Sequence, residues 1–163
     1  MVDGYNVLAA GNPQGLRGIE DLEAARDQLC DRLAGYRAYY GEDVAVVFDA
    51  YRTPNPATDF EKSGIRVVFT DTGETADQRI ERLVYELRDT YKEITVATSD
   101  SAEQQTAFGG GALRISASEL IRRLGLAERR IHNETEKLGK QGNRVIDSIR
   151  QDVATILEKW RRQ

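Results

Sequence analysis

The sequence predicts an α/β fold in which a central, mainly parallel sheet is flanked by helices. Short apolar runs alternate along the chain with longer segments whose apolar residues recur at three- and four-residue spacing. The run Val44–Phe48 is apolar throughout, which is typical of a parallel strand covered on both faces. The length of 163 residues suits one core. We therefore expect a single domain over residues 1–163, with residues 116–163 forming C-terminal helices.

The first elements are a strand, a helix and a second strand. Met1–Tyr5 has the pattern of the end of a strand, and a central strand usually needs about five residues. We therefore expect that the numbering begins inside a longer natural sequence. Ile19–Tyr40 has helical apolar spacing, and Gly41 ends that helix. Val44–Phe48 is an apolar run suited to a strand buried on both faces.

The middle of the chain continues the alternation. Arg52–Ser63 is mostly polar and contains two prolines, which predicts a mobile loop. Ile65–Phe69 is the third predicted strand. Thr75–Tyr91 repeats apolar residues with helical spacing, and Ile94–Thr98 is the fourth predicted strand.

The last strand and the C-terminal helices follow. We expect a short helix at Ser101–Phe108, stopped by Gly109–Gly111, and a short strand at Ala112–Ile115. A serine at 116 and a glutamate three residues later fit a capping box, so a helix starts there and continues toward Leu138. Gly139–Asn143 predicts a break before a final amphipathic helix over Val145–Trp160.

Composition excludes several classes of protein. No apolar run approaches the ~20 residues of a membrane span, and no basic segment followed by an apolar one marks a signal peptide. Cys30 and His132 are the single members of their types, which argues strongly against a structural zinc site. We interpret Cys30 as a packed residue of a cytosolic protein, and His132 as a solvated helix residue.

The net charge of −4 conceals an asymmetry along the chain. Residues 1–108 hold 11 Lys and Arg against 20 Asp and Glu, whereas residues 109–163 hold 12 against 7. An acidic body with a basic C-terminal third suits a metal-dependent enzyme that acts on a polyanion. Ordinary solvated helices explain the same pattern equally well.

Four aspartates follow predicted strands or start the next helix: Asp3, Asp49, Asp77 and Asp100. Because neighbouring parallel strands end at one crevice, we expect these carboxylates to converge. Carboxylates held together repel one another, and a hard divalent cation is the usual reason for such a cluster. A single aspartate at such a position is more often a helix cap, so the prediction depends on several occurring together.

Other carboxylate chemistries fit less well. A phosphatase with an aspartyl nucleophile needs a second aspartate two residues after Asp3, where the chain has Tyr5. A receiver domain built on Asp49 and Thr98 needs a lysine after the last strand, and Gly109–Ser116 has none. No Walker-type phosphate loop exists, and the triple glycine alone does not predict a nucleotide site. A metal-dependent phosphodiesterase remains.

The best ligand candidates for Mg²⁺ are Asp3, Asp77 and Asp100. If the first and fourth strands are neighbours, Asp3 and Asp100 face each other, and Asp77 leans in from its helix. Asn6 is positioned to donate a hydrogen bond to a carboxylate or to the substrate. Four further polar residues support the site: Asp49, Glu74, Thr98 and Ser99.

The sequence resembles a known family at these residues. The motifs that carry the resemblance are Val2-Asp3-Gly4-Tyr5-Asn6, Val47-Phe48-Asp49-Ala50, Glu74-Thr75-Ala76-Asp77, Ala97-Thr98-Ser99-Asp100 and Gly110-Gly111-Ala112-Leu113-Arg114. Together they look like the NYN nuclease domain of the YacP type, which has a PIN-like fold. The resemblance implies a Mg²⁺- or Mn²⁺-dependent endoribonuclease, with Asp3, Asp77 and Asp100 as its acidic residues and Asn6 as its opening asparagine.

The same resemblance implies a cytoplasmic role in mRNA decay on translating ribosomes, with RNA and the ribosome as partners and no membrane. Five arginines follow the glycine run and are candidates for RNA contact: Arg114, Arg122, Arg123, Arg129 and Arg130. They could instead form surface ion pairs with glutamates at 119, 128 and 134. The competing functional class is a PIN-like module that binds RNA or the ribosome without cleaving.

Overall fold

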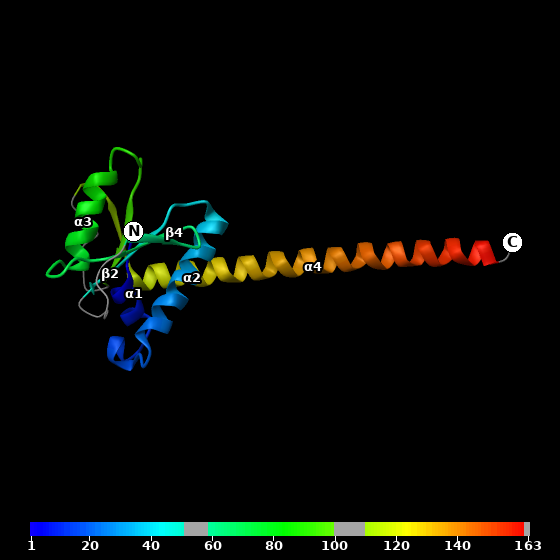
Figure 1. Cartoon of the computed structure of the whole chain (residues 1–163), viewed down its shortest axis with the longest axis horizontal. Coiled ribbons are helices and arrows are strands. Elements are labelled where there is room, and N and C mark those ends of the chain that lie inside the picture. The colour runs from blue at the N-terminus through cyan, green and yellow to red at the C-terminus, as the bar shows by residue number, and fades with distance from the viewer. Residues whose placement is uncertain (51–58, 100–109, 162–163) are drawn as a thin grey trace. The chain divides into compact units, whose positions relative to one another are not determined.

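The computed structural model describes residues 1–50, 59–99 and 110–161 (Figure 1). The chain forms two compact units, residues 1–127 and residues 128–163, and the whole sheet lies in the first. The strands are β1 (Val2–Asp3), β2 (Ala45–Phe48), β3 (Asp59–Lys62), β4 (Ile65–Phe69), β5 (Thr95–Thr98) and β6 (Leu113–Ser116). The helices are α1 (Gly4–Ala10), η1 (Gly15–Gly18, a 3₁₀ turn), α2 (Leu22–Tyr40), α3 (Ala76–Leu87) and α4 (Ala117–Arg161).

The predicted α/β class and the mainly parallel sheet are confirmed. The strand order is β3-β4-β2-β1-β5-β6, and only the β3–β4 pair is antiparallel. Strand β1 pairs with β2 on one side and with β5 on the other, through Val2 opposite Val46 and Val2 opposite Ala97. The first strand and the predicted fourth strand are therefore neighbours, as the convergence of Asp3 and Asp100 requires.

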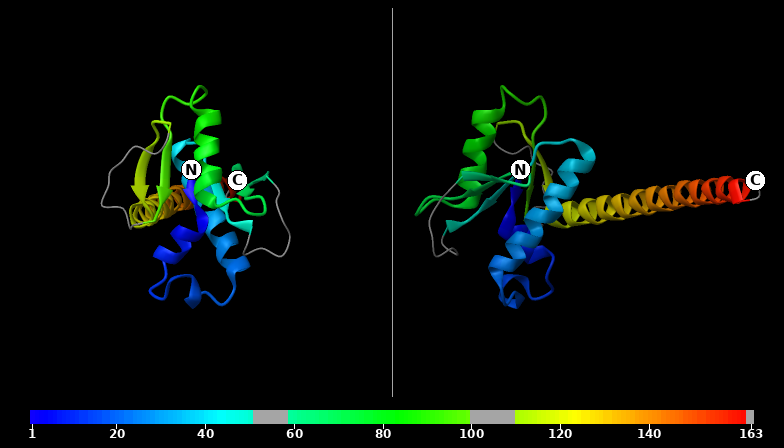
Figure 2. Two further views of the ribbon diagram at one scale, coloured as in Figure 1. Left: turned by 90° about the vertical axis from the view of Figure 1, so that its left-hand side faces the viewer. Right: turned by 45° about the vertical axis from the view of Figure 1, so that its right-hand side comes forward.

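The sheet separates two layers of helix. Because side chains alternate along a strand, Val46 and Phe48 point toward α1 and α2, whereas Val47 points toward α3. Figure 1 shows α3 on one side of the sheet with α1 and α2 on the other, and the two views of Figure 2 agree. Burial on both faces explains why the central strand β2 is an apolar run without polar alternation.

The first strand is shorter than predicted because a helix starts inside its expected range. Asp3 is the N-cap of α1, so Gly4 and Tyr5 are helical rather than extended. A Cβ at Gly4 would lie 2.2 Å from a ring carbon of Phe48, so this turn needs a residue without a side chain. The sequence pattern does not distinguish α1 from the strand, because the apolar residues of the helix follow those of the strand without a break.

Strand β3 lies in the predicted loop Arg52–Ser63, so that prediction is wrong for residues 59–62; residues 51–58 are outside the described part. The strand is polar, and it exists because a tight turn pairs it with β4. Ser63 and Gly64 have φ angles of 52° and 83°. Left-handed residues at both turn positions match the twist of a two-residue hairpin.

Helix α4 runs through the predicted break at Gly139–Asn143. A helical glycine costs only about 1 kcal/mol relative to alanine, and no proline interrupts this stretch. Of the two hydrogen bonds of the predicted capping box, the one from the Glu119 backbone amide to Ser116 Oγ is formed, at 3.1 Å. The predicted short helix at Ser101–Phe108 lies outside the described residues.

Other compositional predictions can be checked on the described part of the chain. Cys30 is buried, and its burial raises the pKa of the thiol, as expected of a packed residue. His132 is exposed on its helix, with Glu136 3.5 Å away. No described helix is both long enough and apolar enough to cross a membrane.

Candidate metal and substrate site

The chain order of the sheet reverses at β1. After β1 the chain adds β2 and β4 on one side, and then returns through α3 to place β5 and β6 on the other. In open parallel sheets, ligands bind beyond the carboxyl ends of the strands at such a switch point. The carboxyl end of β1 is Asp3.

The polar residues at the strand ends share one face of the sheet. Val2, Phe48 and Ala97 belong to the core beneath α1 and α2. The residues that follow them therefore point to the opposite face, over which α3 packs. These residues are Asp3, Asp49 and Thr98, and Thr70 follows β4 in the same way.

Asp3 is a buried carboxylate held rigidly by one neighbour. Only 5% of its surface is exposed, and it accepts hydrogen bonds from the Asn6 backbone amide at 3.1 Å and from Asn6 Nδ2 at 2.7 Å. Burial, and to a smaller extent the charges of Asp77 and Asp49, raise the pKa of Asp3 to about 6 against the lowering effect of these bonds. Asp3 therefore lies within electrostatic range of both aspartates.

Asp77 is not the residue that caps its helix. Thr75 is the N-cap of α3, and it forms a reciprocal capping box with Gln78 through hydrogen bonds of 3.3 and 3.0 Å. Asp77 lies in the first turn and is exposed. A carboxylate there gains from the helix dipole, but the cap does not need it. Its position is therefore consistent with the predicted ligand role.

Asp49 is oriented by a threonine that the sequence analysis did not single out. Thr70 is fully buried; its hydroxyl accepts from the Ala50 amide at 2.9 Å and donates to Asp49 Oδ1 at 3.2 Å. Thr70 follows its strand just as Asp49 follows the paired strand β2. That parallel placement was a signal in the sequence that could have identified it.

We expect Thr70→Val to destabilise the protein by about 1–3 kcal/mol, because it leaves the Ala50 amide without its partner in a partly buried position. Valine keeps the shape, so the loss reports the hydroxyl. Urea unfolding measures it, and the exposed Thr90→Val is the control. Equal stability of the two variants would contradict this role for Thr70.

Glu74 is already paired. Its carboxylate lies 2.9 Å from Arg82 Nη2 and accepts a hydrogen bond from the Asp71 amide at 3.3 Å. These contacts fix the loop that leads into α3. Glu74 therefore helps to hold the loop that positions Asp77, and its carboxylate is not free to bind a metal ion.

The β5 end of the site is described only in part. Thr98 is buried at the end of the strand, next to Asp3 across the β1–β5 pair, and Ser99 is half-buried. Asp100 lies outside the described residues. Within residues 1–50, 59–99 and 110–161, no three Asp, Glu, His or Cys side chains are close enough together to hold a metal ion.

The donors at this edge nevertheless suit a hard cation. Asp3, Asp49 and Asp77 supply carboxylate oxygens, and Mg²⁺ prefers one or two carboxylates with several waters over a full protein cage. Ionised Asp3 is opposed by burial and by both neighbouring charges. A divalent cation would reverse the effect of those charges, so the chemistry of these donors suits a Mg²⁺ or Mn²⁺ ion, although these three described aspartates are not close enough together to coordinate one by themselves.

A cavity of about 990 Å³ lies elsewhere, at the amino ends of the strands. Val44, Thr95 and Ile94 line it, as do Glu42 and Glu93. It contains none of the strand-end aspartates, and parallel sheets bind ligands at the other edge. We therefore locate the candidate site at the carboxyl edge.

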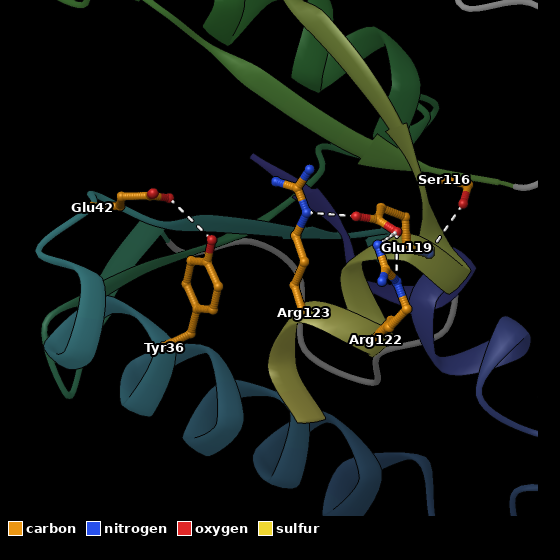
Figure 3. A network of polar contacts seen from close by, with 6 residues as sticks. All are labelled: Tyr36, Glu42, Ser116, Glu119, Arg122 and Arg123. Atoms are coloured by element: carbon orange, nitrogen blue, oxygen red, sulfur yellow. Dashed lines mark hydrogen bonds and ion pairs between the residues drawn. The ribbon is translucent and has the colours of Figure 1, made fainter. Parts of the chain in front are cut away.

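Two of the five candidate RNA-binding arginines are paired within the first unit. Arg122 Nη2 lies 2.8 Å from Glu119, and Arg123 Nε lies 2.9 Å from the same carboxylate (Figure 3). Hydrogen bonds from both arginines lower the pKa of Glu119, and the bond from Arg123 has the larger effect. Arg114 is half-buried on β6, whereas Arg129 and Arg130 are exposed residues of the second unit.

The comparisons with known proteins agree with the fold. The YacP-like NYN domain family matches residues 1–162. The protein YacP of Bacillus subtilis (strain 168), described as uncharacterized, is 40% identical over 167 residues, covering 99% of this chain and 95% of that protein. A crystal structure of Rae1 (YacP) from Bacillus subtilis aligns with a TM-score of 0.71 at 39% identity, over 99% of this chain and 93% of that one.

A crystal structure of a single-substitution variant of Rae1 (YacP) aligns with a TM-score of 0.69 at 41% identity, over 85% of this chain and 82% of that one. Both the sequence match and the structural match span most of the chain. This chain therefore belongs to the YacP-like NYN domain family and has the PIN-like fold of that family.

Proposed function

We propose that this protein is a divalent-metal-dependent endoribonuclease that hydrolyses phosphodiester bonds of RNA. The observation that carries the proposal is the buried Asp3 at the switch point of the sheet, within electrostatic range of Asp77 and Asp49. An α/β protein does not gain stability from gathering like charges there, so the arrangement is better explained by a ligand of opposite charge. Membership of a nuclease-like family supports the same chemistry.

Asp3, Asp77 and Asp100 would hold Mg²⁺ or Mn²⁺, with Asp100 assigned from the sequence alone. An ion held there would supply neutralisation of the scissile phosphate and a lower pKa for an attacking water. Asn6 holds both oxygens of Asp3 in place through its amide groups. Thr70 and the Ala50 amide fix Asp49, and Glu74 fixes the loop before Asp77. Thr98 and Ser99 would orient Asp100.

The substrate that we propose is mRNA, cleaved in the cytoplasm in association with translating ribosomes. This finer assignment depends on the resemblance of the motifs to YacP-type nucleases. The competing function, a PIN-like module that binds RNA or the ribosome without cleaving, makes no use of a metal-binding Asp3.

A cleavage assay separates the two functions. Purified protein is incubated with a labelled single-stranded RNA in Mn²⁺, in Mg²⁺ and in EDTA, alone and with translating ribosomes. An endoribonuclease yields internal cleavage products only with the metal ions. RNA that is retained on the protein and remains whole under every condition, with ribosomes included, would support the binding module.

We also expect the arginines of α4 to contribute to RNA binding through phosphates. Replacing Arg122, Arg123, Arg129 and Arg130 with Ser should weaken binding to RNA or ribosomes and reduce its dependence on salt, by about 0.7 in the log–log slope for each lost phosphate contact on a single strand. Arg17→Ser with Arg88→Ser removes exposed charge elsewhere and serves as the control. Unchanged affinity and slope for both partners would leave these arginines as surface ion pairs.

A further inference from the structure

The start of helix α3 carries a cation as well as a proposed metal ligand. Because the loop after β4 leads directly into α3, this end of the helix lies at the carboxyl edge of the sheet. Asp77 and Arg79 both belong to the first four residues of α3, and in helical geometry their Cα atoms are about 5–6 Å apart. Arg79 is half-buried. A positive charge therefore stands beside the candidate site.

Asp77 and Arg79 act on opposite sides of α3. Each residue advances the helix by about 100°, so side chains two positions apart leave its axis about 160° apart. Burial has the largest effect on the pKa of Asp3, on β1, and the charge of Asp77 raises it as well. Hydrogen bonds from Arg66 lower the pKa of Asp59, on β3, and the charge of Arg79 contributes to the same lowering. Asp77 therefore lies toward the middle of the sheet, and Arg79 toward its β3 edge.

Within the described residues, the guanidinium of Arg79 forms neither an ion pair nor a hydrogen bond. Side chains on a helix pair with those three and four positions away. Around Arg79 these positions hold no acid, since they are Thr75, Ala76, Arg82 and Leu83. Arg82 is itself paired with Glu74 at 2.9 Å. The charge of Arg79 is therefore not neutralised by its own helix.

Asp59 lies within electrostatic range of Arg79, but its carboxylate is already bound by another arginine. Arg66 Nε donates to Asp59 Oδ1 at 2.8 Å and to Oδ2 at 3.0 Å, and Arg66 Nη2 also donates to Oδ2. The charge of Glu86 acts on Arg66 too, but Glu86 is seven residues from Arg79, or about 10 Å along the helix. One carboxylate thus faces two guanidinium groups, which leaves a surplus positive charge at Arg79.

Asp59 shares a face of the sheet with the strand-end aspartates. It pairs with Val68, which packs beneath α3 together with Val47, and Asp49 is two residues after Val47 on the same face. Val68 also pairs with Val47, so Asp59 and Val47 are level. With about 3.3 Å per residue and about 4.8 Å between strands, the Cα atoms of Asp59 and Asp49 are on the order of 12 Å apart. A polyanion that runs from the aspartates across the start of α3 therefore reaches Arg79 without changing face.

We propose that Arg79 is a positioning residue that binds a backbone phosphate of the RNA strand close to the scissile one. The strand then crosses the start of α3 in the direction of β3. The planar guanidinium fork suits a phosphate, because it can donate two parallel hydrogen bonds. This inference rests on the proposed function and adds the path of the substrate. The competing explanation is that Arg79 only adds a second cation to Asp59, which predicts no effect on RNA.

The first test measures the affinity of a fluorescently labelled single-stranded RNA by anisotropy over a salt series. Ca²⁺ replaces Mg²⁺, and a gel verifies that the RNA stays intact. Arg79→Gln removes the charge and keeps a long polar side chain, whereas Arg79→Lys keeps the charge. Arg88→Gln makes the same change at the exposed far end of α3 and is the matched control. Thermal unfolding of each variant verifies that the fold is kept.

We expect Arg79→Gln to reduce the log–log salt slope by about 0.7, the value for one phosphate contact on a single strand, which corresponds to about fivefold weaker binding at 0.1 M salt. Arg79→Lys and Arg88→Gln should keep the slope of the parent protein. An unchanged slope in Arg79→Gln, or the same reduction in Arg88→Gln, would overturn the phosphate site and leave the nuclease proposal intact. A parent protein that binds no RNA would overturn both.

The second test locates the phosphate relative to the cleaved bond. A series of RNAs of one sequence each carries a single uncharged methylphosphonate linkage, and cleavage of each is measured in Mn²⁺. We expect a neutral linkage at a fixed distance from the cleaved bond to slow cleavage by the parent but not by Arg79→Gln, because the partner of that linkage is already absent. Equal sensitivity of both proteins at every linkage would overturn the inference. If the parent cleaves no RNA, the nuclease proposal fails, and the salt slopes still decide whether Arg79 binds a phosphate.

Discussion

Asp77→Asn should abolish metal-dependent RNA cleavage while leaving the fold intact. The loss should be two or more orders of magnitude, about 10²-fold or greater, which is the scale for removing one preorganised charged group from a reacting centre. Asn keeps the shape of the side chain and removes one charge. Because Thr75 and Gln78 cap α3 without Asp77, and because Asp77 is exposed, thermal unfolding should barely change.

The control for this prediction is Asp89→Asn, the same chemical change at an exposed aspartate beyond the far end of α3. Cleavage by this variant should match the parent protein. If Asp77→Asn cleaves at the parental rate, Asp77 is not a ligand. If the variant unfolds instead, its carboxylate stabilises the start of the helix and the assignment to the site loses its support.

Asp3→Asn should make the metal-free protein more stable at neutral pH and remove its stabilisation by metal. The pKa of Asp3 is raised from 3.8 to about 6 in the folded state, so ionised Asp3 opposes folding. The contribution of Asp3 to the free energy of unfolding is therefore greatest below pH 4, falls as the pH rises to about 6, and is level above that. A shift of this size corresponds to a cost of about 3 kcal/mol for ionised Asp3. The gain in stability of the variant should be smaller than this, because asparagine changes the hydrogen bonds to Asn6.

Urea unfolding is measured from pH 4 to pH 8, once in EDTA and once in Mn²⁺ without EDTA. The effect is the difference in the free energy of unfolding between the parent and Asp3→Asn. Asp21→Asn is the matched control, because Asp21 also caps a helix, through the Ala24 amide at 2.9 Å, but is exposed. That variant should differ from the parent by a few tenths of a kcal/mol at most. A flat difference curve for Asp3→Asn would show that its carboxylate carries no cost in the folded protein.

The sequence predicted the strands that are apolar and failed at the elements that tertiary contacts create. Val44–Phe48 and Ile65–Phe69 lie between covering layers, so their composition alone identifies them. Strand β3 has a polar sequence and owes its existence to pairing with β4 across the Ser63–Gly64 turn. The start of α1 depends on Asp3 accepting from the Asn6 amide, a contact that no periodicity reveals.

For the candidate site, the sequence supported a prediction from topology alone. Acidic residues at strand ends could be placed on one edge from topology rules, and the pairing of β1 with β5 confirms the geometry that the prediction assumed. The placement of Thr70 after its strand could have marked it as a strand-end residue, but its hydrogen bond to Asp49 depends on the β2–β4 register, which the sequence alone does not give. The pairing of Glu74 with Arg82 depends on how the loop before α3 lies against the helix, which no spacing in the sequence reveals.

Anomalous scattering from crystals soaked in Mn²⁺ tests the central claim most directly, because it locates the cation without reference to activity. We predict an anomalous peak at the carboxyl edge of β1, coordinated by Asp3, Asp77 and Asp100 and close to Asp49. A peak at another place, or carboxylates that point apart with no peak at high Mn²⁺ concentration, would contradict the claim that these aspartates form a metal centre.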